Sequence, residues 1–181
     1  MHERIFFPLA AVICLAMVIG SFAPIASRAT PSPVEGRAVG DGIVFDVPSL
    51  NRIYGSKETP VAQGPRPGGQ EGVRMVSRGA RLGGGRAATL VFGPETAAMI
   101  AGKRVEITIN ARLMRDYSSR QFGISLGGGR YEVTPPLGNE FRAVTVVVDA
   151  PRDANSLRFW PDMLGEDRGV EVKGISVKVL S

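Results

Sequence analysis

The stretch RVEITINARLM, residues 104–114, begins with a strict alternation of polar and apolar side chains. Val105, Ile107 and Ile109 face one way, and the polar residues between them face the other. A hydrophobic period of two residues is typical of a β-strand that buries one face. The stretch therefore predicts a half-buried strand, and its neighbours in the chain decide which kind of β fold it belongs to.

Short apolar runs bounded by Gly and Pro lie on both sides of this strand, which indicates further strands and turns. Residues 94–101 (PETAAMIA) give the one convincing helical signal, because a Pro and a Glu open the stretch and Gly102 follows it. The alternation of the last strand shifts at Lys173-Gly174, which predicts a β-bulge. The predicted fold is all-β: an antiparallel two-sheet β-sandwich (jelly roll) with one short helix. The other predicted strands are residues 42–47, 73–77, 88–92, 121–126, 130–133, 141–148, 156–160 and 170–180.

Length and composition exclude several classes of protein. The 181 residues fit one domain, and the single Cys and single His are Cys14 and His2. Downstream of these positions the sequence excludes disulfide frameworks, Cys/His zinc sites, Cys nucleophiles and triads with a His base. The net charge is +5, but no Lys/Arg cluster with interleaved aromatic residues accompanies it, so we expect no nucleic-acid partner.

The N-terminal region has the layout of a secretory signal. Residues 5–26 carry no charge, and Ser27-Arg28-Ala29 fits a small-x-small cleavage site after Ala29. As a helix the uncharged run would measure about 33 Å, enough to span a bilayer, so an uncleaved membrane anchor is the alternative. Either reading exports the remainder to a periplasmic or extracellular location, anchored at the inner membrane if the hydrophobic helix is kept.

We therefore expect three segments. Residues 1–29 form the signal peptide or membrane anchor, residues 30–41 form a Pro/Ser/Gly-rich linker, and residues 42–181 form the sandwich domain.

The order of elements in the third segment resembles a known group of domains. A short helix runs into Ala101-Gly102-Lys103, and a long strand and a hairpin follow. Then come Phe159-Trp160-Pro161-Asp162 with a Gly-containing loop, and a last strand VEVKGISV. This order resembles the jelly-roll β-sandwiches of carbohydrate-binding modules and galactose-binding-like domains, over about residues 42–181. The resemblance implies binding of a sugar or glycan through a concave sheet face or an end loop, often with a structural Ca²⁺.

Two groups of residues are candidates for binding. Planar Arg groups and aromatic rings suit sugar hydroxyls, uronic acids or a phosphate. The alternative for the residues around 112–120 is a solvated loop of mixed charge. The candidate ligand-binding residues are Trp160, Arg158, Tyr117, Arg120 and Arg112.

Three carboxylates that follow Trp160 could hold Ca²⁺, which prefers oxygen ligands. These residues are Asp162, Glu166 and Asp167. Their spacing does not match an EF-hand loop, and a hydrophilic hairpin loop is the alternative.

Two further patterns favour structure over catalysis. The motif LGGGR occurs at residues 82–86 and 126–130, and neither copy has the Lys-Ser/Thr ending of a phosphate loop, so both are read as turns. No spacing among the strand carboxylates selects a pair for glycoside hydrolysis, so we expect no enzyme, with such a hydrolase as the minor alternative. The favoured function is an exported, non-catalytic domain that binds carbohydrate, such as an anionic polysaccharide, in the cell envelope. The alternative is a membrane-tethered structural or protein-interaction domain of an envelope assembly.

Overall fold

A computed structural model of the chain describes residues 31–55, 61–62, 72–76, 87–114, 121–162 and 169–180. The chain divides into two compact units, Met1–Thr30 and Pro31–Ser181, and every described residue belongs to the second. The hydrophobic helix expected within residues 1–29 thus lies outside the described residues. No helix in the described ranges is long and apolar enough to cross a membrane.

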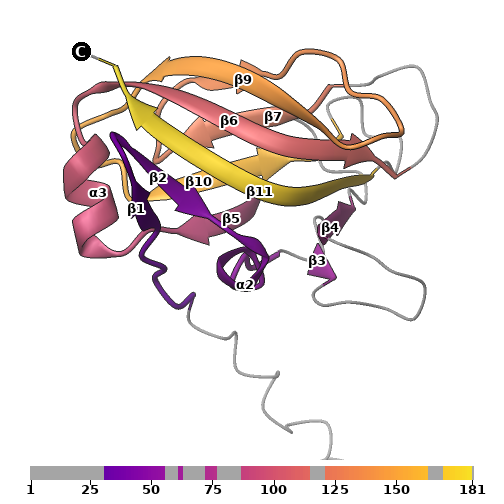
Figure 1. The fold of residues 1–181 in the computed structure, drawn as a ribbon, viewed down its shortest axis with the longest axis horizontal. Coiled ribbons are helices and arrows are strands. Elements are labelled where there is room, and N and C mark those ends of the chain that lie inside the picture. Colours follow the sequence, from indigo (N-terminus) through magenta and orange to yellow (C-terminus); the bar gives the residue numbers. More distant parts are fainter. Residues whose placement is uncertain are drawn as a thin grey trace, which may run out of the picture. The chain divides into compact units, whose positions relative to one another are not determined.

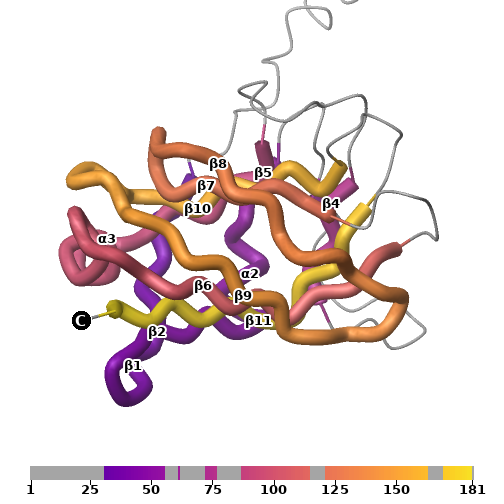
Figure 2. The backbone as a smooth tube through the Cα atoms, turned by 90° about the horizontal axis from the view of Figure 1, so that it is seen from above, coloured from indigo at the N-terminus to yellow at the C-terminus, as the bar shows by residue number. Residues whose placement is uncertain are grey.

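Two antiparallel sheets form the second unit, as Figures 1 and 2 show. The larger has seven strands, in the order β1-β2-β11-β4-β3, with β6 paired to β11 and β9 paired to β6. The smaller has four, in the order β5-β10-β7-β8. This confirms the predicted all-β fold of two sheets. The strands are β1 (Arg37–Val39), β2 (Gly42–Phe45), β3 (Val61–Ala62), β4 (Val73–Val76), β5 (Ala88–Val91), β6 (Arg104–Leu113), β7 (Gly123–Leu126), β8 (Tyr131–Val133), β9 (Arg142–Asp149), β10 (Ser156–Trp160) and β11 (Gly169–Val179), and the helices are α2 (Val47–Leu50) and α3 (Pro94–Ile100).

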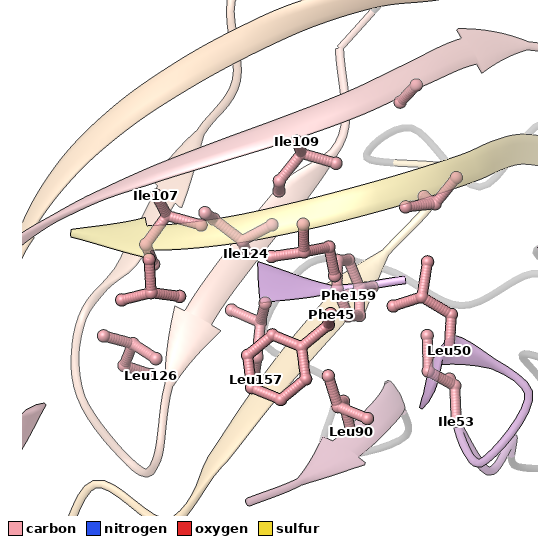
Figure 3. Packing of buried hydrophobic residues seen from close by; sticks show 14 of the residues in the cluster. Phe45, Leu50, Ile53, Leu90, Ile107, Ile109, Ile124, Leu126, Leu157 and Phe159 are labelled. Carbon is pink, nitrogen blue, oxygen red and sulfur yellow. The ribbon is translucent and has the colours of Figure 1, made fainter. Parts of the chain in front are cut away.

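Strand β6 lies between β9 and β11 and shows the predicted alternation. Its apolar residues are buried in the core, and its polar residues face away from the core. Figure 3 shows Ile107 and Ile109 of β6 packing toward Ile124 of β7 and Phe159 of β10, which belong to the smaller sheet. Fully burying each such side chain stabilises the fold by about 1.5–3 kcal/mol. The shared core therefore joins the two sheets, and the outer face of each sheet points away from it.

The bulge predicted at Lys173-Gly174 is confirmed. The register between β11 and β6 shifts between Val172 and Gly174. Before the shift β11 also pairs with β4, and after it β11 pairs with β2. The bulge thus marks the point where the long strand exchanges one neighbour for another, and it leaves the side chain of Lys173 exposed.

Helix α2 was not predicted, because residues 42–47 were read as one strand. The strand ends at Phe45, since Asp46 begins the helix as its N-cap. The carboxylate of Asp46 accepts hydrogen bonds from the Ser49 N–H at 3.2 Å and the Ser49 hydroxyl at 2.9 Å. Pro48 near the first position of the helix is also favourable. A cap of this kind satisfies a backbone donor that the helix leaves free.

Residues 34–39, here named the N-terminal strap, pair with both sheets. The Val34 N–H donates to the Val91 carbonyl at 2.9 Å, and the Gly93 N–H donates to the Val34 carbonyl at 2.8 Å. Further on, β1 pairs with β2 of the larger sheet. The compact unit begins at Pro31, and the segment predicted as a linker, residues 30–41, contains β1 and these hydrogen bonds. The predicted domain bounds stay a prediction.

The second LGGGR copy forms the turn between β7 and β8. Gly127 has φ +56°, a left-handed conformation that favours glycine, and the Gly129 N–H closes the turn on the Leu126 carbonyl at 2.9 Å. The predicted turn at residues 126–130 is therefore confirmed. The copy at residues 82–86 lies outside the described residues.

Candidate ligand-binding face

A row of side chains crosses the outer face of the four-stranded sheet. Arg158 of β10 lies opposite Thr89 of β5 on one side and Ser125 of β7 on the other. Tyr131 of β8 lies opposite Ser125, and Tyr54 forms an isolated bridge with Thr89. Directly opposed residues of antiparallel strands share a face, so these five residues, here named the tyrosine row, project from one side of the sheet.

The alternation of β10 fixes which side this is. Leu157 and Phe159 are fully buried in the core. The residues on either side of them in the strand must point the other way, because successive side chains of a strand alternate between faces. Arg158 and Trp160 therefore both lie on the outer face of the smaller sheet, two residues apart in β10.

The row has exposed rings at its ends and small hydroxyl residues near its middle. Tyr54 is 39% exposed and Tyr131 is 46% exposed, whereas Thr89 and Ser125 are only 6% and 3% exposed. At about 4.8 Å between neighbouring strands, four strand spacings place the two tyrosine backbones about 19 Å apart. This length suits a ligand that extends across the strands.

Arg158 forms the polar centre of the row. It is half-buried, and its guanidinium group makes no ion pair or hydrogen bond within the described part of the chain. The hydroxyl of Ser125 donates to the Gly129 carbonyl at 2.9 Å, which leaves the Ser125 oxygen free to accept a hydrogen bond. No described residue thus occupies the N–H donors of Arg158, and the Ser125 oxygen lies on the neighbouring strand as an acceptor.

Trp160 lies on the same face as the row and packs against its end. It is 3% exposed, and its ring meets the ring of Tyr131 edge to face, with the centroids 5.7 Å apart and the planes at 66°. Its partner in β7 is Gly123, which has no side chain and leaves room for the indole beside the strand. The indole N–H is buried and has no hydrogen-bond partner among the residues that the structure describes. Tyr131, which the sequence does not single out, is the exposed ring of this pair.

Arg112 does not join Arg158 and Trp160. It lies on β6 of the seven-stranded sheet, between the buried residues Ala111 and Leu113, so it points away from the core on the other side of the sandwich. Tyr117 and Arg120 lie outside the described residues. The structure therefore brings together two of the five predicted ligand-binding residues, and the binding role of all five stays a prediction.

The calcium prediction also stays untested. Asp162 is the second residue after β10 and is 1% exposed, while Glu166 and Asp167 lie outside the described residues. Within the described ranges, no group of three or more His, Cys, Asp or Glu residues could hold a metal ion.

Two members of the row could have been found from the sequence, and two could not. The hairpin on either side of residues 126–130 places Ser125 opposite Tyr131 once the turn is fixed, so counting outward from LGGGR identifies both. Thr89 reaches the row only through β10, and Tyr54 only through its bridge to β5. Neither of these long-range pairings leaves a local signal.

No protein-family model and no curated protein matches the sequence. Among solved structures, the chain is similar to the C-terminal family 22 carbohydrate-binding module of Xyn10B from Clostridium thermocellum, with 15% identity, a TM-score of 0.46, and coverage of 78% of this chain and 88% of that one. It is also similar to the CBM35 of Abf62 from Cellvibrio japonicus, with 13% identity, a TM-score of 0.41, and coverage of 75% and 91%.

A third match is the N-terminal CBM22-1–GH10 structure of endo-1,4-β-D-xylanase 10B from Clostridium thermocellum in complex with xylohexaose. The identity is 10%, the TM-score is 0.46, and 78% of this chain is covered. The match spans only 26% of that longer chain. The structural matches thus include carbohydrate-binding modules, the group that the order of elements in the sequence resembles.

Proposed function

We propose that this chain is an exported, non-catalytic β-sandwich domain that binds carbohydrate in the cell envelope through the tyrosine row. The observation that carries the proposal is the row itself. Two exposed tyrosine rings stand at the ends of one sheet face, with an arginine that has no partner among the described residues between them.

The chemistry of the row suits a sugar chain. Tyrosine rings offer an apolar face for packing and a hydroxyl for hydrogen bonding, at a small cost in conformational entropy. A planar arginine fork can donate to two oxygens of one ligand at once. Ligand sites usually combine rings of this kind with a few polar groups that set orientation. Because Arg158 is cationic, we expect the row to prefer a polysaccharide that carries carboxylates over a neutral one.

Calorimetric titration of the full chain with neutral and acidic oligosaccharides tests this proposal. We expect acidic oligosaccharides to bind about tenfold more tightly than neutral ones of equal length, and Arg158→Gln to remove that difference. Arg104→Gln is the matched control, because Arg104 is an exposed arginine on the other sheet. Failure to bind any member of the panel, or an equal loss in both variants, would contradict the proposal.

The absence of catalysis has its own support. Asp46 caps α2, and Glu171 is held by Arg112, so two of the strand carboxylates already have structural partners. Incubation with the oligosaccharides that bind should release no new reducing ends. Turnover that survives Arg158→Gln but disappears in a carboxylate variant would identify the hydrolase instead.

The proposal that the domain is exported is based on the signal-like layout of residues 1–29. The uncharged run at residues 5–26 also favours a second candidate function. In that alternative the run stays in the membrane and the sandwich docks on another protein of an envelope assembly. Sequencing the N-terminus of the protein from cell fractions separates the two. A soluble product that begins at Thr30 supports the secreted glycan-binding domain, whereas an intact N-terminus in the membrane fraction supports the tethered domain.

A further inference from the structure

Arg112 is held in an unusual way on the outer face of the seven-stranded sheet. Its Nε and Nη2 atoms donate to one oxygen of Glu171, Oε2, at 3.1 Å and 2.9 Å. Its guanidinium carbon also lies 4.4 Å from the centre of the Phe141 ring. The carboxylate fixes one edge of the guanidinium group, and the ring covers one side of it. The orientation of Arg112 is therefore set by the protein rather than by solvent.

This arrangement leaves the outer edge of Arg112 available. A guanidinium group has five N–H donors, and Glu171 takes one from Nε and one from Nη2. The remaining donors, on Nη1 and Nη2, form the end-on fork that matches two oxygens of a carboxylate, sulfate or phosphate. The Arg112 side chain is 32% exposed, so a ligand from solvent can reach this fork.

The charges around Arg112 favour an anion. Glu171 lies between Arg112 of β6 and Arg74 of β4 in the register of the sheet, so one carboxylate faces two arginines. The amino group of Lys173 lies 5.7 Å from the centre of the same Phe141 ring. Glu171 is 2% exposed, so a ligand that approaches from solvent does not contact its carboxylate directly. A positive surface with a partly desolvated fork attracts anions more strongly than a lone exposed arginine.

We propose that Arg112 forms a second binding site for an oxyanion, on the opposite side of the sandwich from the tyrosine row. The ligand is a carboxylate or sulfate group, either free or carried on an acidic glycan. Glu171 and Phe141 are positioning residues that hold the fork, and Lys173 adds positive charge beside it. Because the donors are oriented before binding, the ligand does not have to order a mobile side chain.

Nuclear magnetic resonance of the full chain tests the site directly. The probes are sodium sulfate, sodium galacturonate and galactose, and the signal is the Nε–H resonance of Arg112. We expect a saturable shift with sulfate and with galacturonate and none with galactose. Tighter binding of galacturonate than of sulfate would indicate a glycan as the source of the oxyanion, and the reverse order a free ion.

Two substitutions separate the fork from general positive charge. Arg112→Lys keeps the charge and removes the two-pronged fork. Because the substitution also removes the Nε–H signal, its binding is followed through the backbone amide resonance of Glu171, the partner of Arg112 in β11, and we expect binding about tenfold weaker. Arg104→Gln, at the far end of the same face of β6, is the matched control and should leave binding unchanged. Three outcomes would mean an adventitious ion only and would overturn the proposal. They are equal resonance shifts at Arg104 and Arg112, a titration that does not saturate, and undiminished binding by Arg112→Lys.

The site is independent of the tyrosine row. Arg158→Gln should leave the shift of Arg112 unchanged, because Arg158 lies on the other sheet. If the row binds no glycan but Arg112 still binds sulfate or galacturonate, the proposed function fails and this site stands. If Arg112→Lys does not fold, the titration of the unsubstituted chain still decides the proposal.

Discussion

The outer faces of the two sheets each carry a strand arginine, and the two arginines are held in different ways. Arg158 of the four-stranded sheet lies between Thr89 and Ser125, which are small and uncharged. Arg112 of the seven-stranded sheet lies beside Glu171, which binds it through two hydrogen bonds. Arg112 is hydrogen-bonded because a carboxylate lies opposite it on the neighbouring strand. Arg158 has only small hydroxyl residues opposite it.

Arg158 thus has no hydrogen-bond partner among the described residues, whereas Glu171 occupies one edge of the Arg112 guanidinium group. An open arginine adapts to the many hydroxyl positions of a sugar chain, whereas a fixed fork selects a group with two oxygens in one plane. If both proposals hold, one sandwich presents an adaptable glycan site on one side and an oxyanion site on the other. The predictions below test this contrast, from the largest expected effect to the smallest.

The largest effect is expected when Glu171 is removed. Glu171→Ala leaves Arg112 and Arg74 facing each other without the buried carboxylate, and we expect a loss of about 3 kcal/mol in the free energy of unfolding. The expected loss lies at the low end of the range for removing one partner of a buried ion pair, because the Arg112 side chain is partly exposed. Urea unfolding of the variant measures it. Glu106→Ala, on the same face of the sheet, should change stability by less than about 0.5 kcal/mol, and equal losses in both would contradict the contrast.

The next effect concerns the rings of the tyrosine row. Tyr131→Ala removes the exposed ring that packs on Trp160, and we expect about tenfold weaker binding of an acidic oligosaccharide. Tyr54→Ala should weaken binding of long oligosaccharides alone, since Tyr54 stands at the other end of the row. Calorimetric titration with oligosaccharides of increasing length measures both. Identical losses at every length would show that the two rings do not bind one extended chain.

Arg158 should matter little to stability. Since it has no ion-pair partner in the described part of the chain, Arg158→Gln is expected to change the free energy of unfolding by less than about 0.5 kcal/mol. Urea unfolding at neutral pH measures this. A loss comparable to that of Glu171→Ala would mean that Arg158 has a structural role and would remove the difference between the two faces.

The smallest effect is expected in acid, at the strap that joins the two sheets. Desolvation raises the pKa of Glu35, but hydrogen bonds from Thr96 and Glu95 outweigh it and hold the pKa below the usual 4.5. A carboxyl group with a lowered pKa stabilises the fold above the unfolded-state pKa and loses that contribution as the pH falls through its folded-state pKa. The stability advantage of the unsubstituted chain over Glu35→Gln should therefore shrink below about pH 4.5.

Thermal unfolding of the two proteins over a series of pH values measures this advantage. Glu140→Gln, a change at an exposed carboxylate away from the strap, is the control. An advantage that stays constant in acid would show that the charge of Glu35 does not hold the strap.

The fold could be predicted from the sequence because the patterns that indicate its strands and turns lie within short stretches of the chain. The alternation of β6, the phase shift at Lys173-Gly174 and the LGGGR turn at residues 126–130 each depend on residues close together in the chain. Helix α2 was missed although its signal is also local, since Asp46 and Ser49 form a capping pair that the apolar run before it concealed.

The candidate sites could be predicted only in part, because they depend on pairings between distant strands. The sequence grouped Arg112 with Arg158, since both are arginines near aromatic residues, and no local pattern shows that β6 and β10 belong to different sheets. In the sequence, Glu171 cannot be distinguished from the other carboxylates that face outward from strands. Only the register between β11 and β6 places it beside Arg112. The register between strands, which the sequence does not contain in local form, determined both sites.

The N-terminal strap has a mechanical consequence. A force that pulls on the chain from Pro31 first meets the two backbone hydrogen bonds of Val34, and behind them the three hydrogen bonds that the Glu35 carboxylate accepts. Only after these break does the tension reach β1 and the larger sheet. The load is therefore taken first by residues 91–96 and only afterwards by the larger sheet, so the strap protects the edge strand β1 from being peeled away directly.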